Sequence, residues 1–396
     1  MASSSVVITK VSPVTEHSIT SFATGLSTRL APRSRHVAVF LGAGTSKACG
    51  LPDIAELTAA IQTDLEEPEL GQLAARLEKM NLEEALTRLR RIAAIAGDEH
   101  IGGLNGKQAD DLDKIICAAI IAKLTEPANS LRSVLHFGAW VARATYARPV
   151  ELFTVNYDLL IETALEKWGV PYFDGFVGML NATFRPDLVE SPSSEDDQSI
   201  PAFFARVWKL HGSANWAWAA DDPAEVKRLG RPISQSEIAA IYPSESKYDQ
   251  SRRMPFVVLQ DRLRHALNEP ETLMLVTGYS WGDDHINEVF FEATMRRPRS
   301  EVIAFCYGSI PEALAEKAEM TPNLQVVSPT EAIIGGQRGN WKASSPDGLE
   351  GIWDNDEVKL GDFAALAAFL AKGAMPGPRL EEQIAAMLVG KVDTGA

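Results

Sequence analysis

Short apolar segments alternate with helical patterns along the chain. Uninterrupted apolar runs bounded by polar or glycine-rich positions predict buried strands at residues 36–41, 150–155, 203–210, 272–277 and 301–307. Apolar residues at three- and four-residue spacing predict helices at 69–80, 82–96, 110–124, 129–144, 159–168, 257–268, 362–372 and 380–389. Strands separated by helices favour an α/β fold with a mostly parallel sheet.

The pattern also predicts how the chain is divided. Residues 1–35 form a polar N-terminal lead-in. The helical block at 54–149 is too long for one crossover helix, so we expect a helical insertion over or beside the sheet. Residues 311–396 form a C-terminal α/β extension on the core, with a Gly/Trp/Asp-rich loop at 339–357. Asn81 and Ser130 are candidate helix caps.

Polar clusters follow four of the predicted strands. Ligands of parallel α/β sheets bind beyond the carboxyl ends of the strands, so we expect the clusters to lie together there. The cluster residues are Gly42, Ala43, Gly44, Thr45 and Ser46 after the first strand, Asn156 and Asp158 after the second, His211 after the third, and Gly278 and Ser280 after the fourth.

The glycine-rich cluster is typical of a turn that approaches a nucleotide. A complete G-x-G-x-x-G is missing because Lys47 occupies the last position, and the Walker pattern is missing too, so ATP hydrolysis is unsupported. Asp53, shortly after, either caps the helix from Ile54 onward or contacts the ligand.

The other clusters carry candidate chemistry. The carboxamide of Asn156 suits the orientation of a ribose hydroxyl or a water molecule. Asp158 either caps the next helix or binds ligand. The imidazole of His211 accepts a proton near neutral pH. Gly278 and Ser280 either hold a ribose or form a simple turn.

Composition narrows the function classes. The net charge of −15 argues against direct nucleic-acid binding, because an acidic surface repels phosphates. Three scattered cysteines exclude a four-cysteine zinc site and a disulfide framework. The start lacks the features of a signal peptide, and no apolar run approaches the roughly 20 residues of a membrane helix. We therefore expect a soluble, cytoplasmic protein.

In combination, the ordered motifs GAGTS with the later LPD, TVNYD, KLHGS and GYS resemble the sirtuin-like superfamily over residues 36 to about 310. The resemblance implies a Rossmann-type NAD-binding domain at 36–310. Two departures argue against a sirtuin deacylase: the zinc cysteines are missing, and Ile54-Ala55 stands where the deacylases carry Phe-Arg after the proline-aspartate. No zinc module or other metal site is expected.

The NYD and GYSWGDDHIN motifs resemble those of sirtuin-like proteins of bacterial anti-phage defence that consume NAD⁺. This resemblance implies hydrolysis of NAD⁺ as a substrate, with no other cofactor, to nicotinamide and ADP-ribose. Asn156 and His211 are then catalytic, while Asp158, Asp53, the GAGTS residues and Gly278 and Ser280 bind NAD⁺. It also implies a homo-oligomer and a HerA-type hexameric ATPase as partner.

Two alternatives stay open. One is a sirtuin-like protein deacylase or ADP-ribosyltransferase, and the other is a non-catalytic sensor of NAD or ADP-ribose that scaffolds a partner.

Overall fold

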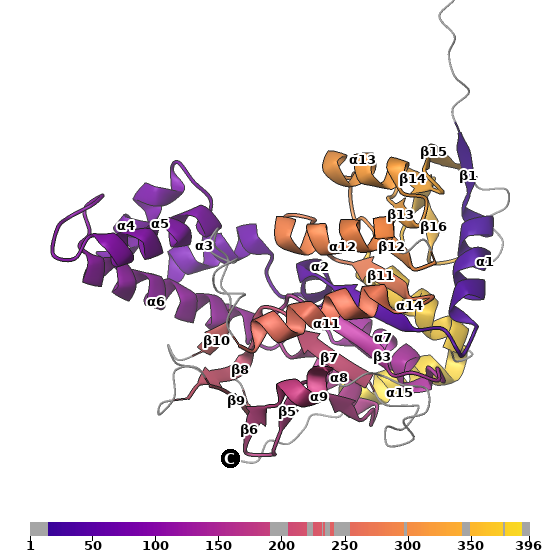
Figure 1. Ribbon diagram of the computed structural model, residues 1–396, viewed down its shortest axis with the longest axis horizontal. Coiled ribbons are helices and arrows are strands. Elements are labelled where there is room, and N and C mark those ends of the chain that lie inside the picture. Colours follow the sequence, from indigo (N-terminus) through magenta and orange to yellow (C-terminus); the bar gives the residue numbers. More distant parts are fainter. Residues whose placement is uncertain are drawn as a thin grey trace, which may run out of the picture.

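A ten-stranded sheet runs through the centre of the protein (Figure 1). The structure is a computed structural model, which describes residues 15–190, 205–219, 225–231, 233, 238–240, 254–296, 299–342, 349–374 and 377–389. The strand order is β1-β15-β14-β13-β12-β11-β2-β3-β7-β4. Much of the predicted N-terminal lead-in, residues 1–14, lies outside the described residues.

The middle of the sheet is parallel and fully covered. It contains β3 (Val150–Thr154), β2 (Val37–Leu41), β11 (Leu273–Thr277) and β12 (Glu301–Phe305), with β7 (Ala205–Lys209) beyond β3. All five residues of β2 are buried, as expected for a strand with helices on both faces. The predicted α/β class with a mostly parallel sheet flanked by helices is confirmed, and the fold is Rossmann-like.

The direction in which the sheet grows reverses beside β2. From β2 the chain adds β3 and then β7 on one side, whereas β11, β12 and β13 (Leu324–Val327) extend the other side. In open α/β sheets, the crevice at such a reversal is where ligands bind. The turns that follow β2 and β11 are therefore the natural place to look for a site.

Helices cover both faces of this sheet (Figure 1). One core cluster contains residues of α1 (Ile19–Leu30), α7 (Arg132–Arg143), α8 (Leu160–Lys167), α14 (Phe363–Ala374) and α15 (Gly377–Val389). A second cluster contains residues of α11 (Phe256–Asn268), α12 (Asp284–Arg296) and α13 (Glu312–Met320). Alternate β2 residues enter opposite clusters, because neighbouring side chains of a strand point to opposite faces.

Part of the predicted insertion has a core of its own. Helices α3 (Ile54–Asp64), α4 (Glu69–Leu77), α5 (Leu82–Ile95) and α6 (Gly106–Leu124) form a lobe beside the sheet (Figure 1). Helix α7, which also falls within 54–149, packs in the main core against α14. The end of α6 returns to the sheet, where Ile121 clusters with Tyr157 and Ala214.

A second, antiparallel sheet lies beyond β7. Its order is β10-β8-β9-β6-β5, and Trp216 of β8 is fully buried in it. The strands are β5 (Phe176–Val177), β6 (Asn181–Phe184), β8 (Gly212–Trp218), β9 (Val226–Leu229) and β10 (Ile238–Ala240). Strand β4 (Tyr172–Phe173) precedes β5 and helix α9 (Pro186–Glu190) follows β6, whereas the short helix α2 (Ala43–Lys47) follows β2.

The C-terminal part adds strands to the main sheet. Here β14 (Glu331–Ile334) and β15 (Gln337–Lys342) pair antiparallel, and β1 (Glu16–Ser18) pairs with β15. The predicted loop at 339–357 was therefore wrong in part, since β15, β16 (Trp353–Asp354) and β17 (Glu357–Val358) overlap it. None of the helices among the described residues has the length and apolar composition needed to cross a membrane.

Candidate active site

The turns after β2 and β11 interlock through glycines. The N–H groups of Gly42 and Gly44 donate to the carbonyls of Thr277 (2.9 Å) and Gly278 (2.8 Å). A Cβ at Gly42 would lie 2.4 Å from the Gly278 carbonyl oxygen, and one at Gly278 would lie 2.6 Å from the Thr45 nitrogen. Gly278 also has a φ of +64°, which glycine tolerates best. These glycines therefore bring two backbone turns into direct contact.

Asn156 ties the turn after β3 to the turn after β2. Its side-chain nitrogen lies 2.9 Å from the Gly42 carbonyl oxygen, 3.0 Å from Thr45 Oγ1 and 2.8 Å from Ser46 Oγ. Thr45 and Ser46 are buried, whereas Ala43 and Gly44 are exposed. The structure thus brings the predicted glycine-rich turn and the predicted carboxamide together.

Asp158 extends this network towards α8. Its Oδ2 accepts a 2.5 Å hydrogen bond from the Ser46 hydroxyl, and its Oδ1 accepts one from the Leu160 N–H at 3.0 Å. The side chain is buried. Asp158 therefore satisfies a helix-start amide, which is one of the two roles considered from the sequence, and its other oxygen contacts the glycine-rich turn.

A buried ion pair beneath the turn was not predicted. Lys209, the last residue of β7, donates to the carbonyls of Tyr157 and Asp158 and lies 3.2 Å from the Glu162 carboxylate. Burial raises the pKa of Glu162 above its usual value, against the opposing attraction of Lys209. Lys209 therefore holds the backbone on both sides of the Tyr157–Asp158 peptide.

His211 is placed where β7 ends and β8 begins. The preceding N–H, of Leu210, donates to the Thr154 carbonyl, and Gly212 turns the chain with a φ of +91°. His211 Nε2 lies 3.7 Å from Asp283 Oδ2, and both side chains are largely buried. A histidine at the end of β7 thus meets a carboxylate from the loop between β11 and α12.

Asp283 is a candidate functional residue that is not among the site residues predicted from the sequence. Its Oδ1 accepts from the N–H groups of His285 (3.2 Å) and Ile286 (3.4 Å), which fixes the carboxylate at the start of α12. The other oxygen faces His211. The signal in the sequence was the acidic pair within GYSWGDDHIN, but nothing there indicated which histidine it meets.

The loop after β11 is held by buried side chains. The Tyr279 hydroxyl donates to Asn287 Oδ1 at 2.9 Å, and Asn287 Nδ2 donates to the Trp281 carbonyl at 2.9 Å. Burial raises the pKa of Tyr279, so it remains a neutral donor. Ser280, by contrast, is exposed beside this fixed loop.

The carboxylate of Asp53 caps the start of helix α3. Its Oδ1 accepts from the N–H groups of Ala55 and Glu56, and the Glu56 carboxylate returns to the Asp53 N–H, which completes a capping box. The Glu56 amide and the Lys47 ammonium lower the pKa of Asp53. Its described contacts join it to Lys47 rather than to Asn156 or His211.

A cavity of about 10 Å³ lies among the polar side chains, on the order of one water molecule. Thr45, Ser46, Asn156, Asp158 and Glu162 contribute to its walls. Hydroxyl, amide and carboxylate groups around such a space are able to orient a small polar group. No cluster of three or more histidine, cysteine, aspartate or glutamate side chains suited to a metal ion occurs in the described part of the chain.

A family model described as a SIR2-like domain matches residues 150–327. The match supports a sirtuin-like family. It indicates an NAD-using activity in general, since proteins of the SIR2-like family use NAD⁺ as substrate. The matched range contains Asn156, His211 and Gly278 of the SIR2-like domain, while the Gly42 turn precedes it. No curated protein is similar enough to this chain to be matched.

Proposed function

We propose that this SIR2-like protein hydrolyses NAD⁺ to nicotinamide and ADP-ribose. Two contacts at the ends of neighbouring strands of one sheet support the proposal: the Asn156 carboxamide binds the glycine-rich turn after β2, and His211 after β7 pairs with Asp283 before α12. The reaction breaks the bond between ribose C1′ and the nicotinamide nitrogen. Water adds its oxygen to C1′ and releases one proton, and nicotinamide leaves as a neutral molecule.

Asn156 is assigned the orientation of water or of the ribose hydroxyls. Its amide nitrogen is already engaged with Gly42, Thr45 and Ser46, which restricts rotation of the side chain. A fixed carboxamide holds a nucleophile near C1′ without loss of further side-chain entropy. Such positioning is the main contribution that a protein makes to a reaction whose leaving group is already good.

His211 is assigned the role of general base. It would take the proton from the attacking water or from a ribose hydroxyl, a contribution of roughly 10²–10⁴-fold. The carboxylate of Asp283 stabilises the imidazolium that forms, because opposite charges attract strongly where water is largely excluded. Burial of both side chains supports this pairing.

The remaining predicted residues are assigned to binding. The backbone of Gly42, Ala43 and Gly44, with Thr45 and Ser46, would line the diphosphate and ribose. Asp158 would meet the nicotinamide amide, and Gly278 and Ser280 the adenosine side. Asp53 lies at the margin of this set, because its carboxylate caps α3.

In its biological setting, the proposed NADase acts in the cytoplasm in bacterial anti-phage defence by depleting NAD⁺. We propose a homo-oligomer that works with a HerA-type hexameric ATPase. We also propose that residues 36–310 form the NAD-binding domain, with a helical insertion at 54–149, and that residues 311–396 form a C-terminal extension.

The test is an NAD⁺-consumption assay with products separated by chromatography, on the chain alone and together with the co-expressed ATPase. Asn156→Ala and His211→Ala should each abolish nicotinamide release while the protein stays folded. Matched controls are Asn268→Ala and His265→Ala on the exposed side of α11, which should keep full activity.

Full activity in a folded His211→Ala variant would refute the mechanism. Release of nicotinamide that requires an acylated lysine peptide or a protein acceptor would instead indicate deacylation or ADP-ribosyl transfer. Saturable NAD⁺ binding without turnover, with the ATPase present, would indicate a sensor.

A further inference from the structure

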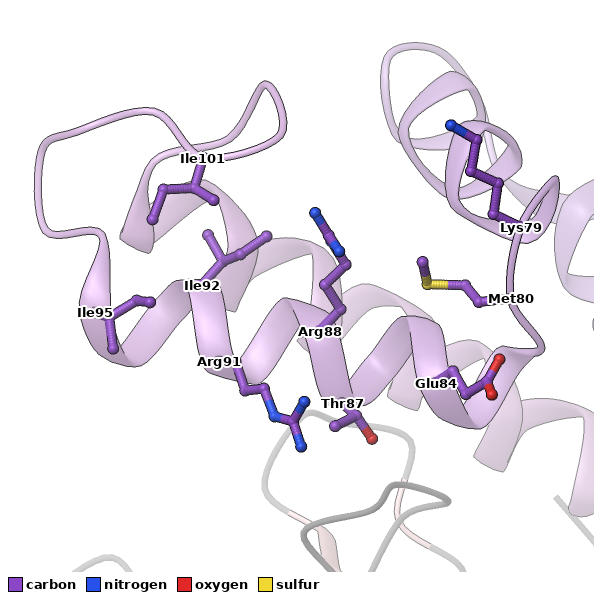
Figure 2. Close-up of a pocket in the computed structure, with 9 residues that line it drawn as sticks. All are labelled: Lys79, Met80, Glu84, Thr87, Arg88, Arg91, Ile92, Ile95 and Ile101. Carbon is purple, nitrogen blue, oxygen red and sulfur yellow. The ribbon is translucent and has the colours of Figure 1, made fainter.

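The helical insertion carries a pocket of its own. Figure 2 shows it along α5, between the segment that follows α4 and the loop that joins α5 to α6. Its volume is about 440 Å³, within the range of small-molecule sites. The lining residues are Lys79, Met80, Glu84, Thr87, Arg88, Arg91, Ile92, Ile95 and Ile101. None of them belongs to the strand-end site.

Basic side chains dominate the charge of this pocket. In Figure 2 the Arg88 guanidinium rises between the Lys79–Met80 segment and the loop with Ile101. Neither Arg88 nor Lys79 has a carboxylate partner among the side chains that the structure describes. These two cations therefore line one concave surface with no described counter-ion, in a chain whose net charge is −15.

A further cation, Arg76, lies behind the lining and adds to the positive potential. Arg76 is buried and donates to Gln72 Oε1 (3.1 Å) and to the Gly102 carbonyl (3.3 Å), both neutral groups. Burial, and then repulsion from Arg88, lowers the pKa of Arg76. The carboxylate nearest in the lining, Glu84, is committed to the Asn81 capping box. Lys79, Arg88, Arg91 and Arg76 outnumber Glu84 by four to one, so the pocket favours a phosphate group, which carries a charge of about −1.5 to −2 at neutral pH.

The rest of the surface is apolar. Ile92 forms part of the buried insertion core, whereas Ile95 is 74% exposed at the rim. Met80 and Ile101 are partly buried beside them. Exposed aliphatic groups beside the Lys79 and Arg88 cations suit a ligand with an anionic end and a flat, weakly polar body.

We propose that this pocket binds a nucleotide-class anion, with its phosphate held by Arg88 and Lys79 and its base packed on Ile92, Ile95 and Ile101. Arginine presents a planar fork of donors that matches phosphate oxygens, and lysine adds a mobile positive charge. The volume accommodates one nucleotide. This binding site is separate from the proposed NADase site, and it does not depend on that activity.

The test uses ADP as the probe, with titration calorimetry on the full chain and hydrogen exchange to locate binding. ADP should bind and protect amides within residues 79–101. Arg88→Ala should weaken that binding about tenfold or more, as expected for loss of one charge-assisted contact. Arg88→Lys should retain part of the affinity, and Ile95→Ser should weaken it less than Arg88→Ala.

Controls separate this pocket from other sites. Arg296→Ala, an exposed arginine on α12, should bind ADP like the wild type, and Asn156→Ala should retain protection of 79–101. Adenosine and inorganic phosphate, each alone, should bind more weakly than ADP. An unchanged affinity in Arg88→Ala, or protection confined to the strand-end turns, would overturn the proposal. Equal binding of poly-glutamate at the same residues would assign the pocket to an acidic peptide instead.

Discussion

Replacing Lys209 by methionine tests how the turn after β3, which carries Asn156 and Asp158, is held in place. The substitution keeps most of the side-chain volume and removes the charge. It takes away the donors to the Tyr157 and Asp158 carbonyls and leaves the Glu162 carboxylate buried without its cation. Breaking a buried pair from one side costs about 3–5 kcal/mol. For a protein of this size, we expect a fall in Tm on the order of 5–10 °C.

The pH dependence gives this prediction a sharper signature. Burial already raises the folded-state pKa of Glu162, so its contribution to stability declines as pH rises through the carboxyl's ordinary range. Without Lys209 that pKa rises further, and the decline extends to higher pH. The Tm difference between Lys209→Met and wild type should therefore be smaller at pH 5 than at pH 8.

Differential scanning fluorimetry at both pH values is the assay. Lys114→Met, which breaks an exposed pair with Asp110 on α6, is the matched control and should shift Tm by no more than a degree or two, since exposed pairs contribute roughly 0–1 kcal/mol. Adding Glu162→Gln to Lys209→Met should recover part of the loss. Equal Tm values for Lys209→Met and Lys114→Met, or a gap that does not change with pH, would refute the reasoning.

Three further predictions concern other parts of the structure. Gly42→Ala should lower the free energy of unfolding by about 1–3 kcal/mol, because its Cβ would meet the Gly278 backbone. Gly25→Ala places its Cβ in open space and should not destabilise the protein. Equal shifts in Tm for the two variants would contradict this prediction. Asp283→Asn should retain the α12 cap but slow NAD⁺ consumption near neutral pH; an unchanged pH–rate profile would remove Asp283 from the mechanism. The three cysteines, Cys49, Cys117 and Cys306, are buried, and burial raises the pKa of the Cys49 thiol to about 11 and that of Cys306 to about 12. No cysteine should therefore react with a disulfide reagent at pH 8 before the protein is denatured. Rapid labelling of the native protein would count against the fold.

The strands of the sheet could be predicted because they are buried on both faces. A strand covered on both sides reads as an uninterrupted apolar run, and β2, β3 and β11 each begin and end within about one residue of the prediction. Local capping was also readable, since Asn81 caps α5 through its own side chain. Ser130 was less informative: α7 starts at Arg132, and Ser130 accepts from that residue's N–H.

The features that could not be predicted from the sequence depend on contacts between residues that are far apart in the chain. Strand β15 alternates exposed and buried residues around Gly339, so its composition resembled a loop. The Lys209–Glu162 pair follows from the register of β7 against β3, where Lys209 lies opposite Thr154. The meeting of His211 with Asp283 depends in the same way on strand order. A single sequence shows which polar residues follow each strand, but it does not show which of them meet.

The packing of Ile121 against Tyr157 joins the helical insertion to the chemistry of the sheet edge. Tyr157 stands between Asn156 and Asp158, so the end of α6 contacts the segment that carries both side chains. If the proposed NAD⁺ binding and the proposed nucleotide binding both shift the end of α6, each ligand would change the affinity for the other by the same factor, by thermodynamic reciprocity. Ile121 is the side chain through which that coupling would pass.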